Sequence, residues 1–126
     1  MRDIDGRLCI FLIKQGGTML LQFEAEPFVN GVVLSKEVRI ALAQRPAESD
    51  SDRVQIAVEL IEAIRRWHKD NARNYLVGSP EHDSFTDQAT YAIRLVKKEL
   101  GVAVKYVKKD HAYLIKYGSE TATAYG

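Results

Sequence analysis

Residues 52–72, DRVQIAVELIEAIRRWHKDNA, are the stretch that decides the fold. Their apolar positions recur every three or four residues, which is the period of an amphipathic helix. These positions are Val54, Ile56, Ala57, Val58, Leu60, Ile61, Ala63, Ile64 and Trp67. A stripe this wide requires cover on two sides. The helix is therefore either the central one of the domain or also packs against a second subunit.

Two shorter elements are predicted before this helix. A β-hairpin turns at Gly16-Gly17, a dipeptide that accepts the positive φ angles of a two-residue turn. Its first face carries Leu8, Ile10, Leu12, Met19, Leu21, Phe23 and Ala25 and is wholly apolar. The opposite face is partly apolar, which predicts an interior strand position or a buried interface. Asn30-Gly31 then signals a turn, and Ser35 is predicted to cap a short helix over 36–44.

A third helix and a second hairpin are predicted after it. The helix has two candidate starts, which are Ser79 with Pro80 at the first helical position and a capping box of Ser84 with Asp87. We favour the second start, which predicts a helix over 85–100 that ends at Gly101. The hairpin follows in VKYVKKDHAYLIKYG, residues 104–118. A two- or four-residue loop within Lys108 to His111 places the three tyrosines on one face with Val104 and Ile115, so we expect Tyr106, Tyr113 and Tyr117 to belong to the core.

Strands at both ends with helices between them predict an α+β fold with a mostly antiparallel sheet. Residues 1–118 are expected to form one domain, because no repeat, linker or low-complexity tract divides them. The tail 119–126, SETATAYG, lacks an apolar pattern and is expected to be frayed.

Composition sets the cellular setting that we expect. Among 126 residues, 46% are hydrophobic and 28% are charged, which is ordinary globular usage. Cys9 is the only cysteine and lies in an apolar run, where a free thiol behaves as a small core residue. No run reaches the 18 or so apolar residues of a membrane span. A cytoplasmic protein with no membrane association and no cofactor is therefore predicted.

Histidines and acids adjoin at three places in the sequence. The pairs are His68 with Asp70, His82 with Asp83, and Asp110 with His111. Their spacing matches no metal-binding or catalytic signature, so a site at His82, Asp83 and His111 is kept as a minority hypothesis and no metal is predicted. Arg65, Arg66 and Lys69 are interpreted as the solvated end of the long helix, with Trp67 pointing inward.

Positive charge gathers toward the end of the chain. Between residues 94 and 116 the cations outnumber the acids by seven to two. They are Arg94, Lys97, Lys98, Lys105, Lys108, Lys109 and Lys116. A basic helix, a glycine and a lysine-tipped hairpin over 85–117 resemble the last helix and wing of a winged-helix DNA-binding domain. The resemblance rests on the helix cations and on Lys108 and Lys109 at the tip, and it implies nucleic-acid binding. All seven cations are the candidate residues for that binding.

The leading functional expectation rests on two apolar surfaces that are large for one small domain. They are the two faces of the first hairpin, taken together, and the wide stripe of the helix over 52–72. They predict a small non-enzymatic binding or regulatory protein that acts through protein contacts, as a homo-oligomer. Nucleic-acid binding by the basic helix and hairpin is the alternative, since lysines also populate ordinary exposed strands.

Overall fold

The structure is a computed structural model that describes residues 10–15, 18–27 and 33–125, and up to residue 20 it describes the backbone alone. Its described elements are β1 (Ile10–Gln15), β2 (Thr18–Phe23), α1 (Val33–Gln44), α2 (Asp50–Ala72), α3 (Pro80–Leu100), β3 (Ala103–Val107), a 3₁₀ turn η1 (Lys108–Asp110), β4 (Ala112–Tyr117) and β5 (Glu120–Ala124). The predicted α+β class is confirmed. The two hairpins do not share one sheet, however, because β1 pairs only with β2, and β3, β4 and β5 form a second sheet.

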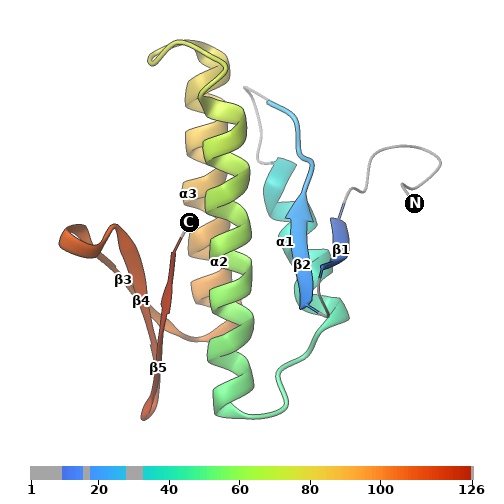
Figure 1. Cartoon of the computed structure of the whole chain (residues 1–126), viewed down its shortest axis with the longest axis vertical. Coiled ribbons are helices and arrows are strands. Elements are labelled where there is room, and N and C mark those ends of the chain that lie inside the picture. Colours follow the sequence, from blue (N-terminus) through green and yellow to red (C-terminus); the bar gives the residue numbers. More distant parts are fainter. Residues whose placement is uncertain (1–9, 16–17, 28–32, 126) are drawn as a thin grey trace.

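Helix α2 lies at the centre of the fold. The β3-β4-β5 sheet covers one side of it and the β1-β2 hairpin lies on the other, with α3 packed alongside (Figure 1). All nine positions of the predicted apolar stripe are buried. The first of the two explanations for that wide stripe is therefore confirmed, because the chain itself supplies the cover.

Helix α3 begins earlier than predicted. Ser79 is the N-cap and accepts a hydrogen bond from the His82 amide at 3.2 Å, and Pro80 occupies the first helical position. The favoured capping box at Ser84 was wrong: Ser84 is buried inside the helix, where Gln88 Nε2 donates to its hydroxyl at 3.1 Å. Gly101 ends the helix in the left-handed region, with φ 67°, as predicted.

Helix α1 also starts before its predicted cap. Its described part begins at Val33, so Ser35 lies within the helix and is buried there. The cap prediction was wrong because Leu34, which is fully buried, belongs to the helix and packs in the core. The predicted turn at Asn30-Gly31 lies outside the described residues.

The N-terminal hairpin has the predicted pairing, but the face that was expected to be wholly apolar also carries Lys14, which lies opposite Met19. Gln15 lies opposite Thr18, and Leu12 lies opposite Leu21, which leaves two residues for the turn. The turn residues themselves lie outside the described residues, as does Cys9.

The C-terminal sheet confirms one prediction and corrects another. Val104 lies opposite Ile115 and Tyr106 opposite Tyr113, as predicted, and of the two loop lengths that fit this pairing the structure has the four-residue one. The tail, by contrast, is not frayed: β5 pairs antiparallel with β4, and Ala124 is fully buried. Gly118 and Ser119 form the tight connection, in which Gly118 has φ 57°.

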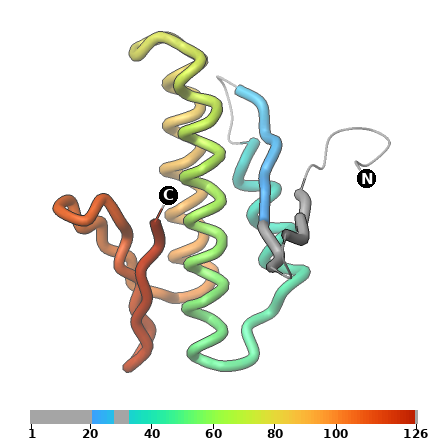
Figure 2. The backbone as a smooth tube through the Cα atoms, in the orientation of Figure 1, coloured from blue at the N-terminus to red at the C-terminus, as the bar shows by residue number. Residues whose placement is uncertain are grey.

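The segment that follows β2 is held by all three helices. Glu37 of α1 accepts a hydrogen bond from the Glu24 amide at 3.2 Å. Trp67 of α2 donates from its indole nitrogen to the Ala25 carbonyl at 3.0 Å, and Gln88 of α3 donates to the Glu26 carbonyl at 3.2 Å. This segment, residues 24–26, runs beside the helices (Figure 2). Three successive residues are thus fixed by one side chain from each helix, and we call this arrangement the three-helix clasp.

Candidate functional site

The seven cations singled out in the sequence are all exposed. Arg94, Lys97 and Lys98 lie three and four residues apart on α3, so they share one face of that helix. Lys105 and Lys116 lie on the same outward face of the sheet, and Lys108 and Lys109 form the tip of the hairpin. Within the described residues, none of the seven forms an ion pair. The structure therefore leaves their charges open to a partner from outside.

The tyrosines of the hairpin are less buried than predicted. Tyr113 and Tyr117 are half-buried, and Tyr106 is 44% exposed. Arginines of α2 lie over these rings: Arg53 is 4.8 Å from the Tyr117 centroid, and Arg65 is 5.2 Å from that of Tyr113. Such cation–π contacts join the sheet to the helix.

Arg65 and Arg66 are not merely solvated, which corrects the interpretation of that helix end. Arg65 donates to the His111 carbonyl at 3.0 Å and to the Ala124 carbonyl at 3.4 Å. Arg66 donates to the Leu21 carbonyl at 3.2 Å. Adjacent arginines therefore join α2 to the C-terminal sheet and to the N-terminal hairpin, respectively. Trp67 points inward, as predicted, and packs edge-on against Phe85 with ring centroids 5.2 Å apart.

A cleft of about 250 Å³ separates the hairpin from α2 and α3. It is lined by Arg65, His68, Lys69, Thr86, Ala89, Thr90, Ile93 and Tyr113. His68 Nε2 lies 3.0 Å from the Thr86 hydroxyl. Burial, with a smaller contribution from the nearby His82, lowers the pKa of His68, so its neutral form is favoured. We call this cavity the basic cleft.

The residues of the minority catalytic hypothesis have separate neighbours. His82 and Asp83 lie in the first turn of α3, with His82 Nδ1 and a carboxylate oxygen of Asp83 3.8 Å apart. The His82 ring faces that of His68 at 6.4 Å, whereas His111 lies at the hairpin tip, with its Nδ1 3.4 Å from the Tyr106 hydroxyl. Among the described residues, His82 and His111 therefore have different ring neighbours. Within that same part of the chain, no three histidine, cysteine or acidic side chains are grouped as a metal site would need.

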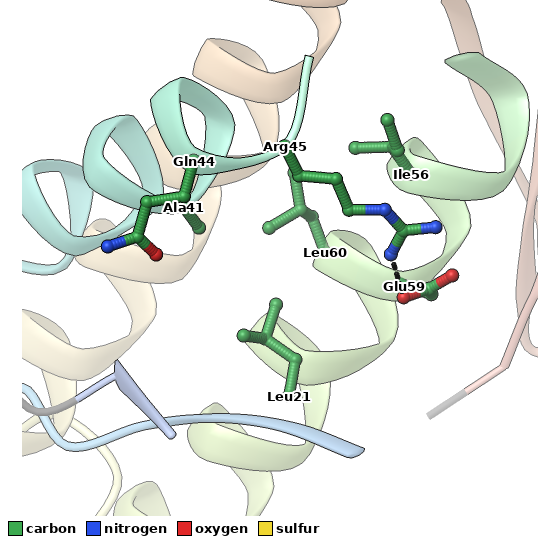
Figure 3. A pocket seen from close by; sticks show the side chains of 7 residues that line it. All are labelled: Leu21, Ala41, Gln44, Arg45, Ile56, Glu59 and Leu60. Atoms are coloured by element: carbon green, nitrogen blue, oxygen red, sulfur yellow. Dashed lines mark hydrogen bonds and ion pairs between the residues drawn. The ribbon is translucent and has the colours of Figure 1, made fainter. Parts of the chain in front are cut away.

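A second cavity, of about 390 Å³, lies between β2, α1 and α2 (Figure 3). Its lining is mostly apolar and consists of Leu21, Ala41, Ile56 and Leu60 with Gln44, Arg45 and Glu59. Arg45 forms an ion pair with Glu59 and lies 3.7 Å from Asp52. Such a volume falls in the range of about 300–1,000 Å³ that is usual for ligand pockets. We call it the apolar pocket.

The connection between α2 and α3, residues 73–79, exposes two aliphatic side chains that the sequence analysis did not single out. Leu76 is 83% exposed and Val77 is 88% exposed. The preceding residue is fixed, since the Tyr75 amide donates to the Ala72 carbonyl at 3.1 Å and its ring packs on Phe85 at 5.6 Å. The Ser79 amide donates a hydrogen bond to the Leu76 carbonyl at 3.0 Å, which closes the turn. A fixed backbone thus presents both side chains to solvent. We call this connection the apolar loop.

Comparisons with known proteins supply no relative: no family model, no curated protein and no solved structure matches this chain. None of the helices in the described part of the chain is long and apolar enough to cross a membrane.

Proposed function

We propose that the protein is a non-catalytic binding protein that associates with copies of itself through the apolar loop. The observation that carries this proposal is the near-complete exposure of Leu76 and Val77 on a backbone held by hydrogen bonds. Adjacent exposed aliphatic side chains are costly in water and typically mark a contact site. Because the loop is already ordered, little conformational entropy is lost when it docks.

The charges around the apolar loop favour a protein partner over a lipid surface. Lys69 and Asp70 precede the loop, Arg73 is its first residue, and Glu81 and Asp83 follow it in the sequence. An anionic membrane attracts segments with clustered positive charge, whereas here the cations do not outnumber the acids.

The apolar pocket is the receptor that we propose on the second copy. Its aliphatic lining matches the chemistry of the loop, and Gln44 and Arg45 supply polar groups near it. The loop cannot reach its own pocket, because Leu60, the α2 residue of the pocket that is nearest the loop in sequence, and Ala72 are separated by about 18 Å along α2 at 1.5 Å per residue. A loop that docks in a neighbour's pocket makes a head-to-tail contact, which builds rings or filaments.

Mutation of the apolar loop should abolish association. We expect light scattering of the native protein to give a mass above that of one chain at micromolar concentration, and the Leu76→Ser, Val77→Ser double variant to give the monomer mass. Gln44→Trp, which places an indole beside the apolar pocket, should also be monomeric. Because each variant keeps the partner surface that the other lacks, an equimolar mixture should form dimers.

Leu114→Ser is the matched control, since Leu114 is exposed on the outward face of the sheet. It should associate as the native protein does. A native protein that stays monomeric throughout, or a loop variant with unchanged mass, would contradict the proposal.

The exposed, unpaired cations favour nucleic-acid binding as a second candidate function. It would use the cations of the basic helix and hairpin, which are Arg94, Lys97, Lys98, Lys105, Lys108, Lys109 and Lys116. Support comes from their exposure and from the absence of ion pairs to the rest of the described chain. Cations that meet phosphates release counterions, so such binding weakens steeply with salt.

Charge reversal at the hairpin tip tests this second function. We expect Lys108→Glu with Lys109→Glu to weaken binding to a mixed-sequence DNA duplex. If both lysines contact phosphate, the slope of log K against log salt should become shallower by about 1.8. Fluorescence anisotropy over a salt series measures both quantities. Lys36→Glu with Arg39→Glu on α1, both exposed, is the matched control. Native binding that does not respond to salt would exclude this function.

A further inference from the structure

We propose that the basic cleft binds the phosphate group of a small organic phosphate. The site is separate from the apolar loop and from the seven cations at the end of the chain, so it goes beyond both functions proposed above. No ligand class is implied by the sequence pattern there, because its residues come from three elements.

Two opposed helix faces supply the polar groups of the cleft. Arg65 and Lys69 lie four residues apart on α2, so both cations project from one face of that helix. Thr86 and Thr90 have the same spacing on α3 and also line the cleft. Two cations therefore lie across from two hydroxyl groups, and both kinds of group can donate hydrogen bonds to phosphate oxygens.

The electrostatics of the basic cleft favour an anion. The residues that line it include no carboxylate to neutralise the cations. Arg65 is held in place by its hydrogen bonds to the His111 and Ala124 carbonyls, so its charge is positioned before a ligand arrives. An ordered cation loses less entropy on binding than a mobile one.

His68 completes the polar side of the cleft. Because burial lowers its pKa, the ring is favoured as a neutral group. In the tautomer that carries hydrogen on Nε2, the ring donates to the Thr86 oxygen, 3.0 Å away. The Thr86 hydroxyl hydrogen is then left for the ligand.

The remaining lining sets the size and character of the ligand. Ala89, Ile93 and the Tyr113 ring are apolar surfaces beside the charged groups. They suit the carbon portion of a phosphate ester better than free phosphate. At about 250 Å³ the cleft is smaller than most pockets for drug-sized ligands, so the ester should be small.

Isothermal titration calorimetry at low salt, with phenyl phosphate, inorganic phosphate and phenol as probes, tests the proposal. We expect phenyl phosphate to bind most tightly and phenol not to bind. Lys69→Gln should weaken phenyl phosphate about tenfold, which corresponds to about 1.4 kcal/mol, and Thr90→Val should also weaken it. Both side chains are exposed, so the variants should fold. A thymidine dinucleotide serves as a phosphodiester probe; tighter binding of it than of phenyl phosphate would assign the cleft to nucleic acid rather than to a small monoester.

Lys98→Gln is the matched control, because Lys98 is an exposed lysine on α3 that does not line the cleft. It should bind phenyl phosphate as the native protein does. The proposal is overturned if no phosphate probe binds up to about 10 mM, or if Lys69→Gln and Lys98→Gln behave alike. Neither result affects the proposal for the apolar loop, whose test measures mass.

Discussion

Replacement of Glu37 by glutamine should make the free energy of unfolding depend less on pH. Much of the decline in stability that the native protein shows between pH 4.5 and about 7 should be absent from the variant. Glu37 is only 2% exposed, and burial raises the pKa of its carboxyl from 4.5 to about 7. The folded state therefore holds a proton on Glu37 over a pH range in which the unfolded chain has released it. Stability from this group is complete below pH 4.5, falls as pH rises, and levels off above about pH 7.

The raised pKa of Glu37 sets how much the free energy of unfolding should change with pH. A difference of about 2.5 pKa units corresponds to about 3 kcal/mol between the two ends of this range. Glutamine keeps the oxygen that accepts the Glu24 amide but does not ionise. Urea denaturation at pH 4.5 and pH 7.5 should show a smaller decline for Glu37→Gln than for the native protein. Glu81→Gln, an exposed carboxylate on the first turn of α3, is the control and should decline as the native protein does. Equal declines in all three proteins would refute the assignment.

Gln88→Leu should destabilise the fold by about 2–5 kcal/mol although leucine is more apolar. The Gln88 side chain is 1% exposed. Its oxygen accepts from the Leu34 amide at 2.9 Å, and its nitrogen donates to the Glu26 carbonyl and the Ser84 hydroxyl. Leucine would remove the partner of the buried Leu34 amide and of the part-buried Glu26 carbonyl, at about 1–3 kcal/mol for each unsatisfied group.

Chemical denaturation at constant pH measures this loss. Gln55→Leu is the matched control, since Gln55 is exposed on α2, and it should change the free energy of unfolding by about 0.5 kcal/mol or less. If Gln88→Leu proved as stable as the native protein, the hydrogen bonds attributed to Gln88 would contribute nothing measurable.

Periodicity predicted the parts of the fold that depend on one element at a time. The stripe on α2 and the register of β3 with β4 follow from spacing within single segments, since a shift of one residue would scatter the apolar side chains. Glycine at 101 marked the end of α3 because only its conformational freedom suits a left-handed cap.

The errors arose where tertiary contacts choose between local signals. Ser79 and Ser84 both have the chemistry of a cap, but Ser84 is buried in the assembled fold and lies inside the helix, whereas Ser79 caps it. Strand β5 was missed because alanine and threonine alternate there with little hydrophobic contrast. Burial of Ala124 depends on α2, far away in the sequence.

The candidate sites were predicted only in part. The exposure of the seven cations follows from their charge, which is visible in the sequence. The basic cleft joins side chains of α2, α3 and β4, so no single segment signals it. Leu76 and Val77 sit in YLVG, an apolar run that usually indicates burial, and only the short turn between two helices exposes them.

The three-helix clasp has a consequence for the order of folding. Its hydrogen bonds join residues that are 13, 42 and 62 positions apart in the sequence. Bringing such distant residues together costs chain entropy before any contact offsets it, which slows this step relative to local pairing. The sheet of β3, β4 and β5 needs only neighbouring residues and can form early. Residues 24–26 can be fixed only after α1, α2 and α3 have assembled, so docking of the N-terminal segment should be the last event of folding and the first of unfolding.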